Sequence, residues 1–212
     1  MIKFIFFKIF KWKIIGFKKL DKKCVLIAGP HTHWVDFFLG LAIRNAINED
    51  IKFIGKKELF IFPLNLIMNY LGGIPVNRNS NTNTVDQISD IFNRRKKFKL
   101  AISPEGTRKK VQNWKTGFYY IAKKSNVPVV CISLNFPERT VTFSKPYELT
   151  NNKDFDFKNF KKKFYWISGE NQRIFMNFQC YDKHFVHHHH PHTFLKACLY
   201  RFFDPHSSLY NC

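Results

Sequence analysis

The chain has 212 residues, of which 45% are hydrophobic and 24% are charged, and it carries a formal net charge of +20. This length suits one α/β domain with a substantial core and is too short for two ordinary domains, and the apolar fraction excludes a disordered chain. The charge restricts the partner to nucleic acid, an anionic membrane surface or an anionic substrate. Five cysteines without a CxxC pair fit a reducing cytoplasmic setting.

The N-terminal region is both basic and apolar. Its first 23 residues contain eight lysines and one acidic residue, interleaved with large apolar side chains. This pattern is typical of a segment lying at a membrane interface, and the lysines interrupt any run long enough to span a bilayer. The segment also lacks the features of a signal peptide. We expect residues 1–20 to form a basic amphipathic membrane-interface segment; an amphipathic helix docked on its own domain is the alternative.

The rest of the sequence alternates short apolar runs with segments of helical spacing. Residues 21–169 are therefore expected to form a single α/β domain with a mixed, mostly parallel sheet flanked by helices. Thr84 is expected to cap its helix, and the His-rich extension at 170–212 receives no function. Strands are predicted at 12–16, 23–28, 51–54, 73–76, 99–103, 128–134 and 139–143, and helices at 2–10, 34–47, 58–70 (with a break near Pro63), 84–97, 114–125 and 154–164.

His31 and Asp36 are the candidate catalytic residues. They stand five positions apart, where the apolar run from Cys24 to Pro30 gives way to a predicted helix. An imidazole on a loop can remove a proton from a hydroxyl near neutral pH, and a nearby carboxylate can hold its ring in one tautomer. Alone, an H-x4-D spacing is a weak signal, and a structural loop histidine is the alternative.

A metal site is a rival interpretation, because His31 and His33 form an HxH pair followed by Asp36. Such sites need further ligands. Phe37 stands where an HxHxDH site would supply a histidine, and no histidine occurs between His33 and His184. We therefore expect no metal and no cofactor.

Three later segments strengthen the catalytic interpretation: Ile74-Pro-Val-Asn-Arg78, Ser103-Pro-Glu-Gly-Thr-Arg108 and Val127-Pro-Val-Val-Cys-Ile132. Together with the H-x4-D stretch, in this order, they resemble the glycerolipid acyltransferase superfamily of glycerol-3-phosphate and 1-acylglycerol-3-phosphate acyltransferases. The resemblance runs from about Lys11 to about Gly169. It implies the acyltransferase fold of that family, with His31 as general base and Asp36 as its partner.

The resemblance also implies an acceptor site. Arg108 offers a planar fork suited to phosphate, and Gly106 permits close backbone approach. A surface turn with an exposed ion pair is the alternative for this segment, and a solvated charge pair is the alternative for Lys57. Relatives often carry Asp where Asn77 precedes Arg78. The residues expected to bind the acceptor are Lys57, Arg78, Glu105, Gly106, Thr107 and Arg108.

We therefore expect an enzyme that moves a fatty acyl group from acyl-CoA or acyl-carrier protein to a lysophospholipid hydroxyl, as in 1-acylglycerol-3-phosphate, for phospholipid biosynthesis. It should lie in the cytoplasm, on the inner face of the membrane. Other acceptors are glycerol-3-phosphate, an amino-acid-based lyso-lipid or a lipid A precursor. A basic nucleic-acid-binding protein is the alternative from another class, but the sequence contains no recognisable binding module, so no nucleic acid is expected.

Overall fold

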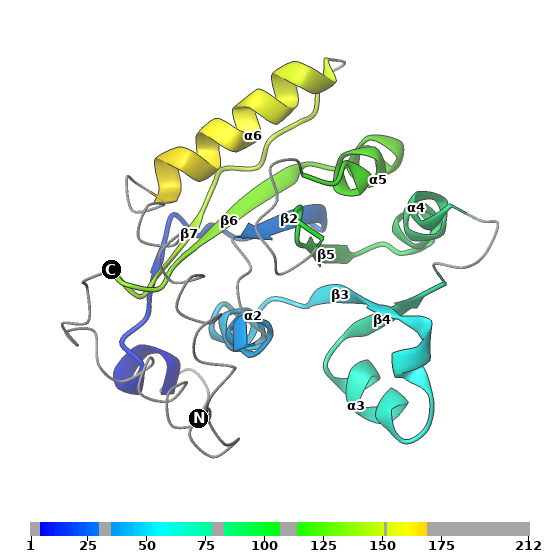
Figure 1. The fold of residues 1–212 in the computed structure, drawn as a ribbon, viewed down its shortest axis with the longest axis horizontal. Helices are drawn as coiled ribbons and strands as arrows, with labels where there is room; N and C mark the ends of the chain where they lie inside the picture. Colours follow the sequence, from blue (N-terminus) through cyan, green and yellow to red (C-terminus); the bar gives the residue numbers. More distant parts are fainter. Residues whose placement is uncertain (1–4, 30–34, 78–82, 107–113, 151, 169–212) are drawn as a thin grey trace, which may run out of the picture.

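A computed structural model describes residues 5–29, 35–77, 83–106, 114–150 and 152–168. Its centre is a seven-stranded sheet in the order β1-β7-β6-β2-β5-β3-β4 (Figure 1). All pairings are parallel except that of β6 with β7. The strands are β1 (Lys13–Ile15), β2 (Lys23–Gly29), β3 (Ile51–Lys56), β4 (Gly73–Val76), β5 (Phe98–Ile102), β6 (Val129–Asn135) and β7 (Thr140–Phe143). The predicted α/β class with a mixed, mostly parallel sheet is confirmed.

Helices cover both faces of this sheet. Figure 1 shows α4, α5 and α6 on one side and α2 on the other. The described helices are η1 (Ile5–Ile9), α2 (Val35–Ala46), η2 (Lys57–Phe60), α3 (Leu64–Tyr70), α4 (Thr84–Arg94), α5 (Gly117–Ser125) and α6 (Lys153–Ser168). Here η1 is a π-helical turn and η2 a 3-10 helix. Because both faces are covered, the central strands are buried on both sides, which explains their continuous apolar sequences.

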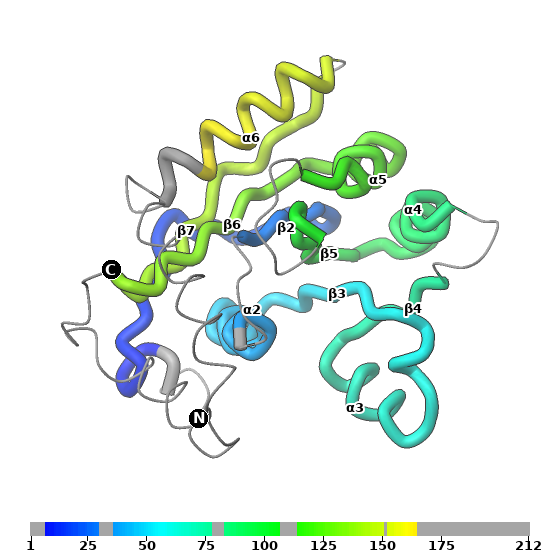
Figure 2. Tube along the Cα trace, in the orientation of Figure 1, coloured from blue at the N-terminus to red at the C-terminus, as the bar shows by residue number. Residues whose placement is uncertain are grey.

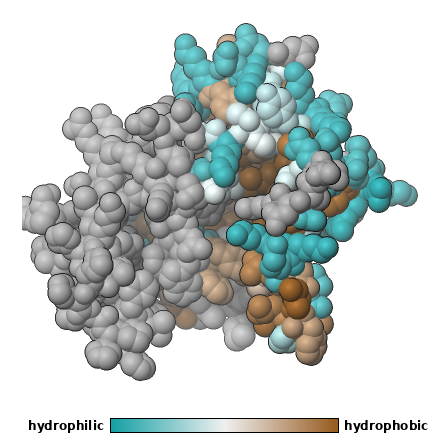
Figure 3. All heavy atoms as spheres, turned by 45° about the vertical axis from the view of Figure 1, so that its right-hand side comes forward, coloured by the Kyte–Doolittle hydropathy of each residue, from teal (hydrophilic) through white to brown (hydrophobic). Residues whose placement is uncertain are grey.

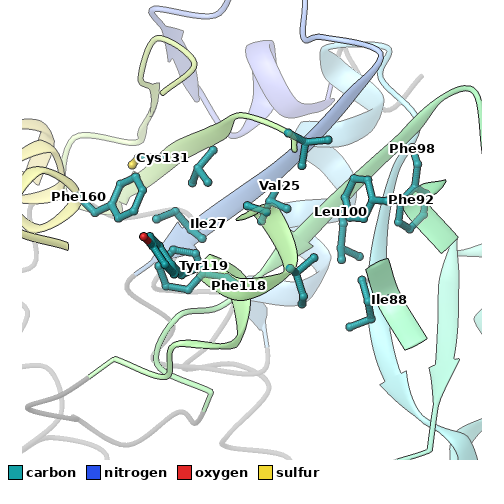
Figure 4. Close-up of a cluster of buried hydrophobic side chains, with 14 of the residues drawn as sticks. Val25, Ile27, Ile88, Phe92, Phe98, Leu100, Phe118, Tyr119, Cys131 and Phe160 are labelled. Atoms are coloured by element: carbon teal, nitrogen blue, oxygen red, sulfur yellow. The ribbon is translucent and has the colours of Figure 1, made fainter. Parts of the chain in front are cut away.

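Successive residues of β2 contribute to two separate cores. Val25 and Ile27 face α4, α5 and α6, and the buried rings of Phe160, Phe118 and Phe92 are spread along this face of the sheet (Figure 4). Cys24 and Leu26 point to the opposite core, which α2 closes together with the buried Trp12 just before β1. This alternation follows from the two-residue repeat of a strand.

The thiols of Cys24 and Cys131 are buried on opposite faces of the sheet. Burial disfavours the charged thiolate, so it raises the pKa of Cys24 to about 12 and that of Cys131 to about 11. Both behave as small apolar core residues.

Three helix boundaries differ from the prediction for local reasons. Asn83, not Thr84, caps α4, because its side chain accepts a hydrogen bond from the Val85 N–H at 3.1 Å. The same helix ends at Arg94, since Arg95 is already extended. Helix α5 begins at Gly117 rather than at 114, because the Lys115 N–H is bonded to the Pro104 carbonyl at 2.8 Å.

Between β3 and β4 the chain makes an excursion through η2 and α3, on the same side of the sheet as α2 (Figure 2). The excursion is anchored at both ends. A Cβ on Gly55 or Gly73 would lie 2.8 or 2.9 Å from the Phe60 ring, so this ring packs directly on both glycine backbones. At the other end, Arg44 Nη1 donates to the carbonyl oxygens of Leu71 at 2.6 Å and of Ile51 at 3.2 Å.

Gly72 is required where the excursion returns to the sheet. Its φ is +85°, and an added Cβ would lie 2.6 Å from Arg44 Nη1. We expect Gly72→Ala to lower the free energy of unfolding by about 1–3 kcal/mol. The control is Gly40→Ala in the exposed middle of α2, where an added Cβ meets nothing within 4 Å, and which should stabilise by about 0.5–1 kcal/mol. Chemical denaturation measures both; equal effects would contradict the role of Gly72.

Candidate active site at the carboxyl edge of the sheet

The five neighbouring strands β6, β2, β5, β3 and β4 run parallel, so their carboxyl ends lie at one edge of the sheet. The register brings the strand ends level: Ile27 pairs with Ile102, and Lys56 pairs with Val76. The segments predicted to hold the site all follow these ends. The edge therefore gathers parts of the sequence that lie far apart along the chain.

The connections after β2 and β5 diverge at this edge. The chain leaves β2 toward α2, which packs on the core containing Leu26, whereas it leaves β5 toward α5, which packs on the core containing Ile27. Adjacent strands whose connections pass to opposite faces define a topological switch point, the usual ligand site of open α/β sheets. The β2–β5 boundary is therefore the expected ligand site of this fold.

Asp36 lies on the α2 side of this boundary. It stands in the first turn of α2, and it is only 2% exposed. The N-terminus of a helix favours a carboxylate, because the first N–H groups carry partial positive charge. A carboxylate fixed in this way has a defined position relative to the end of β2, from which the His31 segment departs.

Glu105 lies on the β5 side of the boundary and approaches the end of β2. Its Oε1 is 3.6 Å from the position that a Cβ on Gly29 would occupy, and Phe164 Cε1 of α6 is 3.7 Å from the same position. Gly29 is the last residue of β2, directly before residues 30–34. The carboxylate of the motif at 103–108 is therefore close to the end of the strand that leads into the H-x4-D stretch.

A tight turn positions Glu105. The Gly106 N–H donates to the Ser103 carbonyl at 3.2 Å, and Gly106 has a φ of +62°. The aliphatic part and Nζ of Lys115 cover Gly106, so that an added Cβ would lie 2.5 Å from Lys115 Cδ. The glycine is thus needed for its backbone conformation, whereas the exposed end of the lysine could move aside for a side chain.

The structure shows no contact with the end of β2 for the other predicted residues that it describes. Lys57 is exposed in η2, after β3, and β5 separates β3 from β2. Asn77 follows β4, and its carbonyl accepts a hydrogen bond from Gln87 Nε2 of α4 at 3.1 Å, which fixes the chain just before position 78. The predicted site residues that lie outside the described part are His31, Arg78, Thr107 and Arg108.

Sequence reasoning gave no role to Lys115 or Phe164, which the structure brings to this edge. Lys115 belongs to a Trp-Lys-x-Gly stretch that follows the motif at 103–108, so its place in the sequence could have indicated that it lies near this motif. Phe164 lies on α6, and its contact with Trp114 (ring centroids 5.1 Å apart) comes only from the fold. Within the described ranges, no group of three or more His, Cys, Asp or Glu residues is placed to hold a metal.

Two surface hollows lie away from this edge. One, of about 220 Å³, is next to Asn126 at the end of α5, and the other is next to Asn48 after α2. Both helix ends lead into the amino ends of strands, at the opposite edge of the sheet. The predicted motifs follow the carboxyl ends of the strands, so neither hollow lies beside them.

An open α/β sheet with carboxylates on both sides of its switch point defines a class of ligand-binding and catalytic domains. Comparison with known families narrows this class. The acyltransferase family model matches residues 12–135, more than half of the chain, and the chain belongs to this family.

Two curated relatives carry the name 1-acyl-sn-glycerol-3-phosphate acyltransferase. The chloroplastic enzyme BAT2 of Brassica napus is 31% identical over 133 residues, which cover 59% of this chain and 37% of the relative. The beta enzyme of Homo sapiens is 32% identical over 116 residues, covering 51% of this chain and 40% of the relative. The matched region is thus less than half the length of either relative.

A solved structure shares the fold. It is that of the 1-acyl-sn-glycerophosphate (LPA) acyltransferase PlsC from Thermotoga maritima, which aligns with a TM-score of 0.56 over 77% of this chain and 75% of that chain, at 18% sequence identity. The match includes enough of both chains to establish a common sheet architecture.

The positive φ of Gly106 leads to a stability prediction. Gly106→Ala should destabilise the fold by about 1–3 kcal/mol, because it places a side chain at positive φ. Lys115→Ala alone, at an exposed position, should change stability by less than about 0.5 kcal/mol. Because the end of Lys115 can move aside, the loss in the double variant should equal the sum of the two single losses within about 0.5 kcal/mol. Chemical denaturation measures all three variants, and a Gly106→Ala loss below about 0.5 kcal/mol would contradict the need for glycine at this position.

Proposed function

We propose that this protein transfers a fatty acyl group from an acyl thioester, either acyl-CoA or acyl-carrier protein, to the hydroxyl of a lysophospholipid such as 1-acylglycerol-3-phosphate. Family membership and the names of the two curated relatives support this class of reaction. The observation that supports the proposal is the approach of Glu105 to Gly29, because Glu105 belongs to the motif proposed to bind the acceptor and Gly29 directly precedes the segment proposed to contain the catalytic pair.

In the proposed mechanism, His31 removes the proton of the acceptor hydroxyl as its oxygen attacks the thioester carbonyl. A tetrahedral intermediate forms, the C–S bond then breaks, and His31 returns the proton to the departing thiolate. Asp36 holds the imidazole in one tautomer and stabilises the imidazolium as it forms. Its burial at the start of α2 suits this role, because a fixed carboxylate does not have to be ordered during the reaction.

The acceptor's phosphate is proposed to lie between the end of β4 and the turn after β5. Arg78 and Arg108 would bind it, with Gly106 and Thr107 allowing close approach. Glu105 would orient Arg108 or the acceptor hydroxyl. The strand before Lys57, β3, is two strands from β2, which at the usual strand spacing separates the two strands by roughly 10 Å. The proposed contact of Lys57 is therefore with the outer part of the acceptor's head group.

A peripheral position on the inner face of the membrane is part of the proposal. Among the described helices, none has the length and apolar character needed to cross a bilayer. In the N-terminal segment, Phe7 and Ile9 are exposed, whereas Trp12 is buried in the domain core. The exposed apolar residues before Trp12, together with the lysines between them, would contact the lipid surface.

The first experiment measures acyl transfer to 1-acylglycerol-3-phosphate in liposomes, with radiolabelled acyl-CoA and, separately, acyl-carrier protein. His31→Ala should lower kcat on the order of 10²- to 10⁴-fold, the usual contribution of a general base. His33→Ala is the matched control in the same segment and should retain most of the activity. Equal product from the wild type and His31→Ala would show that His31 is not the base.

A second prediction addresses the phosphate. Arg108→Ala should raise KM for 1-acylglycerol-3-phosphate roughly 10- to 100-fold, the loss expected for a charge-assisted contact, and Arg108→Lys should recover only part of it, because lysine lacks the planar fork. KM for the acyl donor should stay unchanged. Steady-state kinetics with an uncharged monoacylglycerol acceptor provides the control: an equal loss with that acceptor would contradict a phosphate-binding role.

A further inference from the structure

The most exposed apolar surface of the described chain lies on η2, α3 and the residues between them, and none of its apolar members is among the residues proposed to bind substrate. None of the described side chains of η2 or α3 is buried. Phe62 is 77% exposed and Tyr70 is 87% exposed. Figure 3 shows hydrophobic side chains gathered where α3 lies. We call this surface the α3 patch; its members are Leu59, Ile61, Phe62, Leu64, Leu66, Ile67 and Tyr70.

Contacts with the rest of the domain hold the α3 patch in place at both ends. The Phe60 ring fixes its beginning against Gly55 and Gly73, and Arg44 fixes its end through the Leu71 carbonyl. Between these two anchors the chain folds into a helix that packs on η2 and β4 and directs its apolar side chains outward. A segment fixed at both ends yet apolar on its outer side needs a partner, because large exposed apolar surfaces are disfavoured in water.

We propose that the α3 patch inserts into the acyl-chain boundary of an anionic lipid bilayer. Residues 61–70 contain no charged side chain, so the patch can enter the apolar layer without desolvating an ion. Lys56 and Lys57 are exposed immediately before it and, with one intervening acidic side chain at Glu58, can contact anionic head groups. Tyr70, at the end of α3, suits the interfacial layer, where its ring is buried and its hydroxyl stays hydrated.

The chemistry of the patch favours lipid over a protein partner. The patch is a projecting helix without charged side chains, whereas specific protein contacts need polar groups that fix orientation. The net charge of +20 also favours an anionic surface over a second, equally basic copy of the chain. The excursion leaves from the carboxyl end of β3, which forms part of the proposed active-site edge, and returns to the amino end of β4. Insertion of its first part, around Phe62, would therefore bring the β3 end of this edge to the lipid surface.

The test measures vesicle binding of the full chain without any acyl donor. Vesicles contain phosphatidylcholine alone, or equal parts of phosphatidylcholine and phosphatidylglycerol. Combining Phe62→Gln with Leu66→Gln should lower partitioning into the anionic vesicles on the order of 10- to 100-fold, because two large apolar side chains no longer enter the bilayer. The matched control combines Tyr120→Gln with Phe155→Gln, two exposed aromatic positions on α5 and α6 across the sheet, and should bind like the wild type.

Hydrogen exchange on the wild type identifies what covers the patch. The inference expects residues 61–70 to exchange quickly in solution and to become protected when anionic vesicles are added. Protection without vesicles would overturn it: if the protection persists on dilution, another part of the same chain covers the patch, and if it disappears, a second copy does. Undiminished vesicle binding by the Phe62 and Leu66 variant would also overturn it. The His31→Ala variant should bind vesicles normally, which separates failure of this inference from failure of the proposed activity.

Discussion

The parallel pairing of β2 with β5 is the constraint on which the candidate site depends. Five backbone positions of β2 pair with five of β5, from Lys23 with Phe98 to Ile27 with Ile102. A shift by one residue would exchange the two faces of β2, so that Val25 and Ile27 would have to fit the core that Cys24 and Leu26 fill. Both cores are apolar, so the register depends on how these particular side chains pack. The same register sets the distance between Gly29 and the turn that holds Glu105. Core packing and site geometry are therefore determined by one set of side chains.

Much of the fold could be predicted from the sequence, because short apolar runs and helical spacing leave local signals. The stretch from Cys24 to Gly29 is apolar on both faces, and it forms the central strand β2. The order of the strands left no such signal, since many pairings bury the same residues equally well. The alternation of strands and helices predicted a mixed sheet but could not place β5 between β2 and β3.

The residues of the candidate site likewise include some that the sequence predicted and some that only the fold reveals. Asp36 and Glu105 were found because they belong to motifs at the ends of predicted strands, and the structure places both at the same edge. Phe164 could not be found, because its approach to Gly29 depends on how α6 lies across the sheet. The exposure of α3 was equally hidden: residues 61–70 have the composition of a core helix, and only the tertiary structure shows that they point outward.

The packing of the Phe60 ring limits which substitutions this domain can accept during evolution. It rests on the backbones of Gly55 and Gly73, and a side chain at either glycine would collide with it. No one of these three positions can be altered without weakening the attachment of the α3 excursion, so they are constrained jointly and not one by one. The three positions should therefore covary among homologues, and grafting this excursion onto another sheet would require both glycines together with the ring.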